Sequence, residues 1–266
     1  MKKILGICGD SFMSSDLPDR VNSAYGKHFT EILGKMLNCD VVTYARGGIS
    51  NQSIRLQIDE IIKHNPHHII IGTTSPDRIE IPVDDLSVVN LWDKLSNHKF
   101  KPSNGLYNIV YEGFENQSLL HENFKKIKPS MYSQNLSSIL QIFEEQIWVS
   151  SKHHLSKETS DAVRLYFQNL YDMEWKRQQD TWIISEGLYK LNSLGLDFNV
   201  IIQHLNDDYF THCKDKLIRI HDKLNPWTYY EQDAICHNPF HISDESSIKL
   251  AELWFEILKD KFIKII

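Results

Sequence analysis

The sequence predicts an α/β fold built on a parallel β-sheet. Short apolar segments of strand length alternate with longer segments of helical periodicity, and polar loops follow the predicted strands. Strands that are joined by helical crossovers run parallel in one sheet. The chain has 266 residues and no long linker rich in Pro, Gly or Ser, so we expect a single domain over 1–266 with an insertion at about 80–155.

The predicted elements follow in order along the chain. Strands are predicted at 3–8, 41–44, 68–71 and 198–202. Helices are predicted where apolar residues recur on one face, within 21–36, 54–62, about 157–194 and 243 to about 264. Pro66 stops the second helix, and Gly195 ends the long third one. The insertion has no clean period, and we expect it to be largely helical and packed over or beside the sheet.

Composition excludes several classes of protein. The net charge is −6 and the basic residues are scattered, so no nucleic-acid partner is expected. No apolar run approaches the roughly 20 residues that span a bilayer, and we expect a cytoplasmic protein. The four cysteines form no C-x-x-C pair and are interpreted as free thiols, although a disulfide between two of them stays open. The motifs of zinc peptidases, P-loops and dinucleotide sites are absent, so neither metal nor cofactor is expected.

Four polar loops contain the candidate functional residues. Gly9-Asp10-Ser11 follows the first predicted strand, residues 45–51 follow the second, and residues 72–78 follow the third. The fourth loop, 237–243, precedes the last helix. Ligands of parallel sheets bind where the strands end, so we expect these loops to meet.

Each loop also has a simpler interpretation. Gly9-Asp10-Ser11 is a common strand-to-helix turn, and Ser50 or Asn51 is a suitable helix cap. An isolated histidine such as His241 is more often structural than catalytic. The order and spacing of the four loops together are therefore more informative than any one of them.

Together the loops resemble the four blocks of the SGNH (GDSL-like) hydrolases, in a divergent form. Ser11 looks like the nucleophile of the first block, and Gly48 looks like the second-block glycine whose N–H donates to the oxyanion. Thr74 stands at the Asn position of the family's G-x-N-D block. His241 looks like the general base of the last block.

The resemblance covers residues 1–80 and 198–262 and leaves out the insertion. It implies a three-layer flavodoxin-like fold. It also implies transfer of an acyl group from a small-molecule or glycan ester to Ser11, with no cofactor. Asp10 and Asn51 are further candidates for the oxyanion and substrate site.

Three positions depart from the family pattern. The Asp three residues before the base is Asn238, the block-three Asn is Thr74, and the Pro after the base is Ile242. An Asn amide oxygen still orients an imidazole but does not stabilise its charge, so we expect a slow enzyme. Asp233 and His237 are the rival orienting residue and the rival base.

Two alternatives remain open at this stage. A catalytically degenerate SGNH fold would bind a glycan or an acylated ligand without turnover, as the changes at Asn238 and Thr74 indicate. A nucleotide-binding α/β domain would use the Gly9-Asp10-Ser11 turn to hold a phosphate. The sequence indicates neither the natural ester nor the oligomeric state. The insertion leaves from the loop that contains Thr74, so we expect it to border the site.

Overall fold

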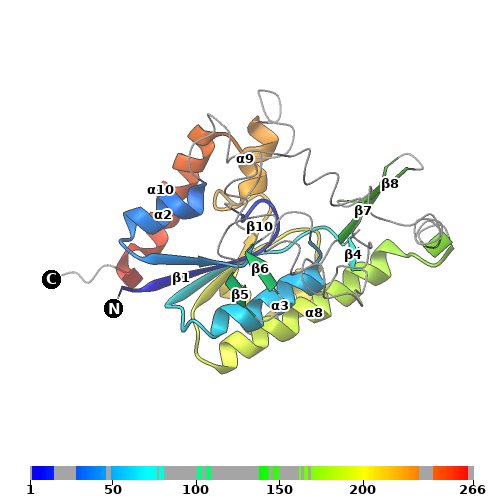
Figure 1. Cartoon of the computed structure of the whole chain (residues 1–266), viewed down its shortest axis with the longest axis horizontal. Coiled ribbons are helices and arrows are strands. Elements are labelled where there is room, and N and C mark those ends of the chain that lie inside the picture. The colour runs from blue at the N-terminus through cyan, green and yellow to red at the C-terminus, as the bar shows by residue number, and fades with distance from the viewer. Residues whose placement is uncertain are drawn as a thin grey trace.

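Figure 1 shows a computed structural model of the chain. It describes residues 2–14, 28–45, 49–76, 78–80, 101–103, 106–108, 138–143, 146–149, 162, 165–166, 169–233 and 242–262. These residues form a three-layer α/β fold, in which a parallel sheet lies between two layers of helices. The fold class that the sequence predicts is therefore confirmed.

The central sheet has five strands. They are β1 (Ile4–Cys8), β2 (Asp40–Thr43), β3 (His68–Gly72), β9 (Phe198–Ile202) and β10 (Leu217–Arg219). Their order is β10-β9-β3-β1-β2, and every neighbouring pair is parallel. This is the flavodoxin-like order, whose direction reverses between β1 and β3. A ligand is expected outside the ends of these two strands, at what we call the carboxyl edge of the sheet.

Two pairs of helices cover the faces of the sheet (Figure 1). The helices α2 (Phe29–Met36) and α10 (Asp244–Phe262) pack together on one face. The other face is covered by α3 (Asn51–Ile62) and α8 (Met173–Ser193). Alternate side chains of each strand point into different cores, because successive strand residues face opposite sides.

Both cores are densely apolar. The first is formed by Leu5, Ile7, Phe29, Leu33, Ile70, Leu250 and Trp254, among others. The second is formed by Cys8, Ile54, Ile58, Ile71, Ile184, Leu188 and Val200, among others. Burying one such aliphatic or aromatic side chain contributes about 1.5–3 kcal/mol, so these two cores supply the main driving force for the fold.

The long helix α8 ends where the sequence predicts, and a side-chain cap at Asp172 marks its start. At its end, Gly195 has a φ of 67° and donates its N–H to Asn192 O at 3.0 Å. At its start, Asp172 is extended and its side chain accepts the Trp175 N–H at 2.7 Å. Residues 162, 165–166 and 169 are also helical, so the long helical segment predicted from about 157 is interrupted before this cap, and residues 157–161 lie outside the described part of the chain.

The described part of the insertion consists of strands. They are β4 (Ile79–Glu80), β5 (Lys101–Ser103), β6 (Leu106–Asn108), β7 (Ser138–Phe143) and β8 (Gln146–Val149). All of their pairings are antiparallel, in one sheet of order β4-β7-β8 and in the β5-β6 pair. For these residues the expected helical insertion is corrected. Segments such as 146–149 are rich in β-branched and aromatic residues, which favour strands.

Several short elements after β9 are absent from the sequence-based prediction. They are the 3₁₀ helices η2 (Asp207–Tyr209) and η3 (Thr211–Lys216), strand β10, and helix α9 (Pro226–Asp233). Each is too short to show a period. Pro226 begins α9 at the position where a helix tolerates proline best.

Candidate functional site

Ser11 lies in the turn that directly follows β1. The Asp10 side chain accepts the Phe12 N–H at 3.0 Å, and the Asp10 carbonyl accepts the Met13 N–H at 3.1 Å. Within the described part of the chain, neither the N–H nor the hydroxyl of the half-buried Ser11 has a hydrogen-bond partner. The turn is thus held by its neighbours, while both polar groups of Ser11 remain available.

Gly9 determines how β1 ends. Its φ is 148°, and a Cβ at this position would lie 2.4 Å from Met13 Cγ and 3.0 Å from the Gly72 carbonyl oxygen. The side chain of Gln57 accepts the Gly9 N–H at 2.7 Å and donates to the Gly9 carbonyl at 3.3 Å. Any larger residue would therefore displace the turn that carries Ser11.

The Asp10 carboxylate joins three loops at the carboxyl edge. Its side chain is buried, and its Oδ2 accepts the Thr74 hydroxyl at 2.8 Å and Arg78 Nη1 at 3.2 Å. The same Arg78 nitrogen donates to the Ile49 carbonyl at 3.0 Å. A buried carboxylate requires a charge partner and hydrogen bonds, and Asp10 has both.

A second ion pair lies beside the first. Asn51 Oδ1 accepts the Thr74 N–H at 2.9 Å, and Asn51 Nδ2 donates to the Thr74 carbonyl at 2.8 Å and to Asp180 Oδ2 at 3.0 Å. The fully buried Asp180 is paired with Lys176. Asp10, Asn51, Thr74, Arg78, Asp180 and Lys176 form what we call the buried network, whose two acids balance its two bases.

The buried network engages three of the predicted site residues. Asp10, Asn51 and Thr74 make their hydrogen bonds to one another and to Arg78 and Asp180, as given above. The Thr74 hydroxyl has one hydrogen and donates it to Asp10 in this structure. Their roles toward an oxyanion or a substrate stay predictions, and the geometry shows that all three position the loops. The helix cap is Ser50, and Asn51 is the first helical residue.

Gly48, Asn238 and His241 lie outside the described residues, as does the rival base His237. The residues on either side of the last loop are described. Helix α9 ends at Asp233, and Ile242 is buried directly before α10. Ile242 belongs to the same apolar core as Met13, two residues from Ser11. Ile242 and Met13 therefore belong to the same layer of the fold, between the sheet and the pair α2 and α10.

An aromatic cluster connects this turn with α9. Phe12 stacks on Trp227 with ring centroids 4.1 Å apart, and it meets Tyr230 edge-on at 5.5 Å. His28 caps α2, where its Nδ1 accepts the Thr30 N–H. The ring hydrogen is therefore on Nε2, which donates to the Phe12 carbonyl at 3.1 Å. Sequence reasoning assigns no role to these residues.

Arg78, Gln57, Asp180 and Lys176 are also absent from the predicted site. Their side chains reach the site from a strand-end loop and from two helices. Gln57, Arg78 and Asp180 have partners far away in the sequence, whereas Lys176 pairs with Asp180 one helical turn away. The available signal was small: Arg78 is a basic residue in one of the four loops, and Asp180 is an acid among the buried positions of α8.

The described residues offer few groups for other chemistry. They contain no cluster of three or more His, Cys, Asp or Glu side chains suited to a metal ion. Cys8, Cys39 and Cys213 are free and buried, and Cys236 lies outside the described residues. Burial raises the pKa of the Cys39 and Cys213 thiols to about 11, which disfavours the nucleophilic thiolate.

In the part that the structure describes, no helix is long and apolar enough to cross a membrane.

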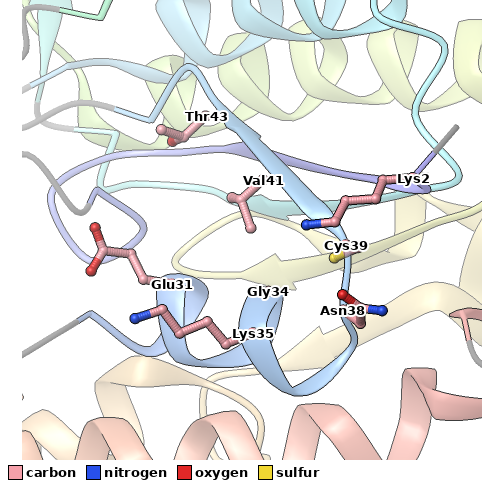
Figure 2. Close-up of a pocket in the computed structure, with 8 residues that line it drawn as sticks. All are labelled: Lys2, Glu31, Gly34, Lys35, Asn38, Cys39, Val41 and Thr43. Atoms are coloured by element: carbon pink, nitrogen blue, oxygen red, sulfur yellow. The ribbon is translucent and has the colours of Figure 1, made fainter.

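Figure 2 shows a pocket whose lining residues do not include Ser11. It has a volume of about 550 Å³ and lies between α2 and the edge strand β2. Glu31 and Lys35 of α2 line it together with Val41 of β2 (Figure 2). None of the predicted site residues lines this pocket, so it does not belong to the candidate site.

No protein-family model matches the chain, and no curated protein matches it. Among solved structures, the chain is similar to a protein from Desulfitobacterium hafniense DCB-2 that is described as a lipolytic protein of the G-D-S-L family. The match covers 61% of this chain and 98% of that chain, with 16% identity and a TM-score of 0.24. A TM-score this low establishes no common fold, and the fold assignment rests on the strand order.

Proposed function

We propose that this chain is a serine hydrolase of the SGNH type, with Ser11 as nucleophile and His241 as general base. One observation carries the proposal: Ser11 has an unbonded hydroxyl and N–H at the switch point of the sheet, in a turn that its neighbours hold in place. Trp227 of α9, the helix before the loop that contains His241, stacks on Phe12 next to Ser11, which supports an approach of His241 to this turn.

The proposed reaction is acyl transfer from a carboxylic ester. His241 takes the proton of the Ser11 hydroxyl while Ser11 Oγ attacks the carbonyl carbon, and the carbonyl oxygen becomes an oxyanion. The N–H groups of Ser11 and Gly48 donate to that oxyanion, and one such donor is worth about 2.7–4 kcal/mol in the transition state. His241 then protonates the leaving alkoxide. Water attacks the acyl-serine in the same manner and regenerates Ser11.

A slow enzyme is expected because two family positions are changed. Asn238 would orient His241 through its amide oxygen, but it adds no negative charge to stabilise the imidazolium. The Thr74 hydroxyl, which stands where the family has Asn, donates to Asp10. This second observation favours the alternative of a binding module without turnover, in which Ser11 would not be acylated.

Labelling with a fluorophosphonate separates the two functions. We expect the wild-type protein to be modified at Ser11, as mapped by peptide mass spectrometry, and neither Ser11→Ala nor His241→Ala to be modified there. Turnover of a short-chain aryl ester should follow the same pattern and rise as the pH passes about 6.5, where an unperturbed imidazole loses its proton. Ser193→Ala, at the far end of α8, is the control and should resemble wild type.

Two further variants test the assignment of the base and its partner. Asn238→Asp should raise turnover, because a carboxylate stabilises the imidazolium, whereas Asp233→Asn should change it little. Equal rates for wild type and Ser11→Ala would exclude Ser11 as the nucleophile. Loss of activity in His237→Ala but not in His241→Ala would assign the base to His237.

A further inference from the structure

Thr74 has no hydrogen left for an oxyanion. In the proposed reaction the N–H groups of Ser11 and Gly48 donate to the oxyanion, and Thr74 is a third candidate at the same edge of the sheet. Its hydroxyl donates to Asp10 Oδ2 at 2.8 Å, and its N–H donates to Asn51 Oδ1 at 2.9 Å. Both hydrogens of Thr74 are therefore committed, and a third donor has to come from another residue.

The Arg78 guanidinium connects the two loops that would supply these N–H groups. Its Nη1 donates to Asp10 Oδ2 at 3.2 Å and to the Ile49 carbonyl at 3.0 Å. Asp10 directly precedes Ser11, and Ile49 directly follows Gly48. One nitrogen of Arg78 thus links the two backbone segments that would hold the oxyanion.

The other terminal nitrogen of Arg78 is free. A guanidinium has five N–H donors in a rigid plane, and two of them are on Nη2. Within the described part of the chain, the hydrogen bonds of Arg78 involve Nη1 alone. Nε is buried without a partner and is out of reach of a ligand, whereas Nη2 is not among the unpartnered atoms that are buried. Arg78 therefore presents the two hydrogens of Nη2 at the carboxyl edge.

The charge of Asp10 makes a cationic donor favourable at this point. A buried carboxylate one residue before the nucleophile opposes the negative charge that develops on the carbonyl oxygen. Arg78 neutralises this carboxylate, and the two side chains are only 13% and 1% exposed. Because Asp10 and Ile49 hold Nη1 in place, the guanidinium needs little reorganisation before Nη2 donates. A hydrogen bond from a charged donor is also roughly twice as strong as one from a neutral donor.

We propose that Arg78 is a catalytic residue whose Nη2 donates a hydrogen bond to the oxyanion, a role that rests on the proposed function. As the bond between Ser11 Oγ and the carbonyl carbon forms, the π electron pair of the carbonyl moves onto its oxygen, and the hydroxyl proton goes to His241. Arg78 keeps all of its protons. It stabilises the oxygen by its charge and by the hydrogen bond alone.

Two variants separate donation from charge balance. Arg78→Lys keeps a cation for Asp10, but a single ammonium cannot occupy the positions of both terminal nitrogens. Asp10→Asn/Arg78→Met removes both charges together with the donor. In both variants we expect kcat for a short-chain aryl ester to fall about 100-fold or more, the typical loss for one oxyanion donor, while KM stays near that of wild type. Arg55→Lys is the matched control, because Arg55 pairs with Asp59 and Glu186 and is also 13% exposed, and it should keep the wild-type kcat.

A trifluoromethyl ketone gives a readout that a general loss of structure does not imitate. Attack by Ser11 on a short alkyl trifluoromethyl ketone forms a tetrahedral adduct that has the oxyanion, whereas the corresponding alcohol binds without one. In Arg78→Lys the inhibition constant of the ketone should rise by about the same factor by which kcat falls, and the alcohol should bind as it does to wild type. Circular dichroism checks that each variant is folded.

Each outcome decides the role of Arg78. Wild-type kcat in Arg78→Lys would overturn the donor role and leave the hydrolase proposal intact. Near-wild-type kcat in Asp10→Asn/Arg78→Met would also overturn it, because Arg78 would then only neutralise Asp10. Equal losses of affinity for the ketone and the alcohol would count against a donor that acts on the oxyanion. If the wild-type protein neither hydrolyses the ester nor is labelled at Ser11, the proposed function fails, and the donor role fails with it.

Discussion

Asp10 is the residue around which the candidate site is organised. Its carboxylate shapes the Ser11 turn through the Phe12 N–H, and it holds the β3 loop through Thr74 and Arg78. Burying a carboxylate is costly, and the cost is offset only while its cation and donors stay in place. The ion pair thus contributes defined geometry more than net stability, which is consistent with its place beside a proposed nucleophile.

The Asp10–Arg78 pair gives a prediction at the scale of single residues. Arg78→Met should lower the free energy of unfolding by about 3 kcal/mol, because it leaves a buried carboxylate without its cation. Urea denaturation monitored by circular dichroism measures the loss. The double variant Asp10→Asn/Arg78→Met removes both charges and should recover more than half of it. If single and double variants lose the same stability, the charge partnership is not the cause.

At the scale of elements, α8 determines where several site residues lie. It runs from the carboxyl edge toward the opposite edge of the sheet, with Ile184, Leu188 and Leu191 buried along its length. Lys176 and Asp180 pair in its first turns, and Asp180 accepts a hydrogen bond from Asn51 on α3. The start of α8 therefore positions part of the buried network.

The helix cap at Asp172 allows a prediction about this start. Asp172→Ala should reduce the free energy of unfolding by about 1 kcal/mol, because the Trp175 N–H loses its acceptor. Asp172→Asn keeps a capping oxygen and should remain close to wild type. Urea midpoints of the three proteins test this. A midpoint for Asp172→Asn as low as that of Asp172→Ala would show that charge, rather than the cap, stabilises the helix.

The elements also show what the sequence could predict. The strands at 4–8, 68–72 and 198–202 are apolar runs of ordinary length, and their helical crossovers imply a parallel sheet that brings Ser11 and Thr74 to one edge. Periodicity does not detect β10 or α9, because both are short. It also gives no information on the pairing of Asn51 with Asp180, since that contact depends on how two helices pack.

At the scale of the whole molecule, a second charged cluster ties the other edge of the sheet together. His68 begins β3, and its Nδ1 lies 3.4 Å from Asp197, which precedes β9. Lys261 of α10 and Lys216 before β10 also pair with Asp197, the latter at 3.9 Å. This cluster joins two neighbouring strands to the last helix, so its protonation affects the stability of the whole fold.

The protonation of His68 gives the final prediction. Burial lowers the pKa of His68 from its ordinary value of 6.5, and the contacts with His68 and Lys261 hold the pKa of Asp197 well below its usual range. Between the folded pKa of His68 and 6.5, the unfolded chain binds a proton that the folded protein does not. The stability contributed by His68 is therefore present above about pH 6.5 and is lost as the pH falls through this window. Asp197 adds a similar loss at lower pH, below the ordinary value of 3.8.

Urea denaturation at pH 7.5 and pH 5.5 measures this linkage. The wild-type protein should be less stable at the lower pH, and His68→Gln, which has no titrating group at this position, should lose less stability between the two. His221→Gln removes an exposed histidine and should retain more of the wild-type pH dependence than His68→Gln does. A pH dependence in His68→Gln that equals that of wild type would show that the His68 ring does not take up a proton on unfolding. Because the difference between variants is compared at each pH, contributions from the other histidines cancel, and the result reports on the cluster that joins β3, β9 and α10.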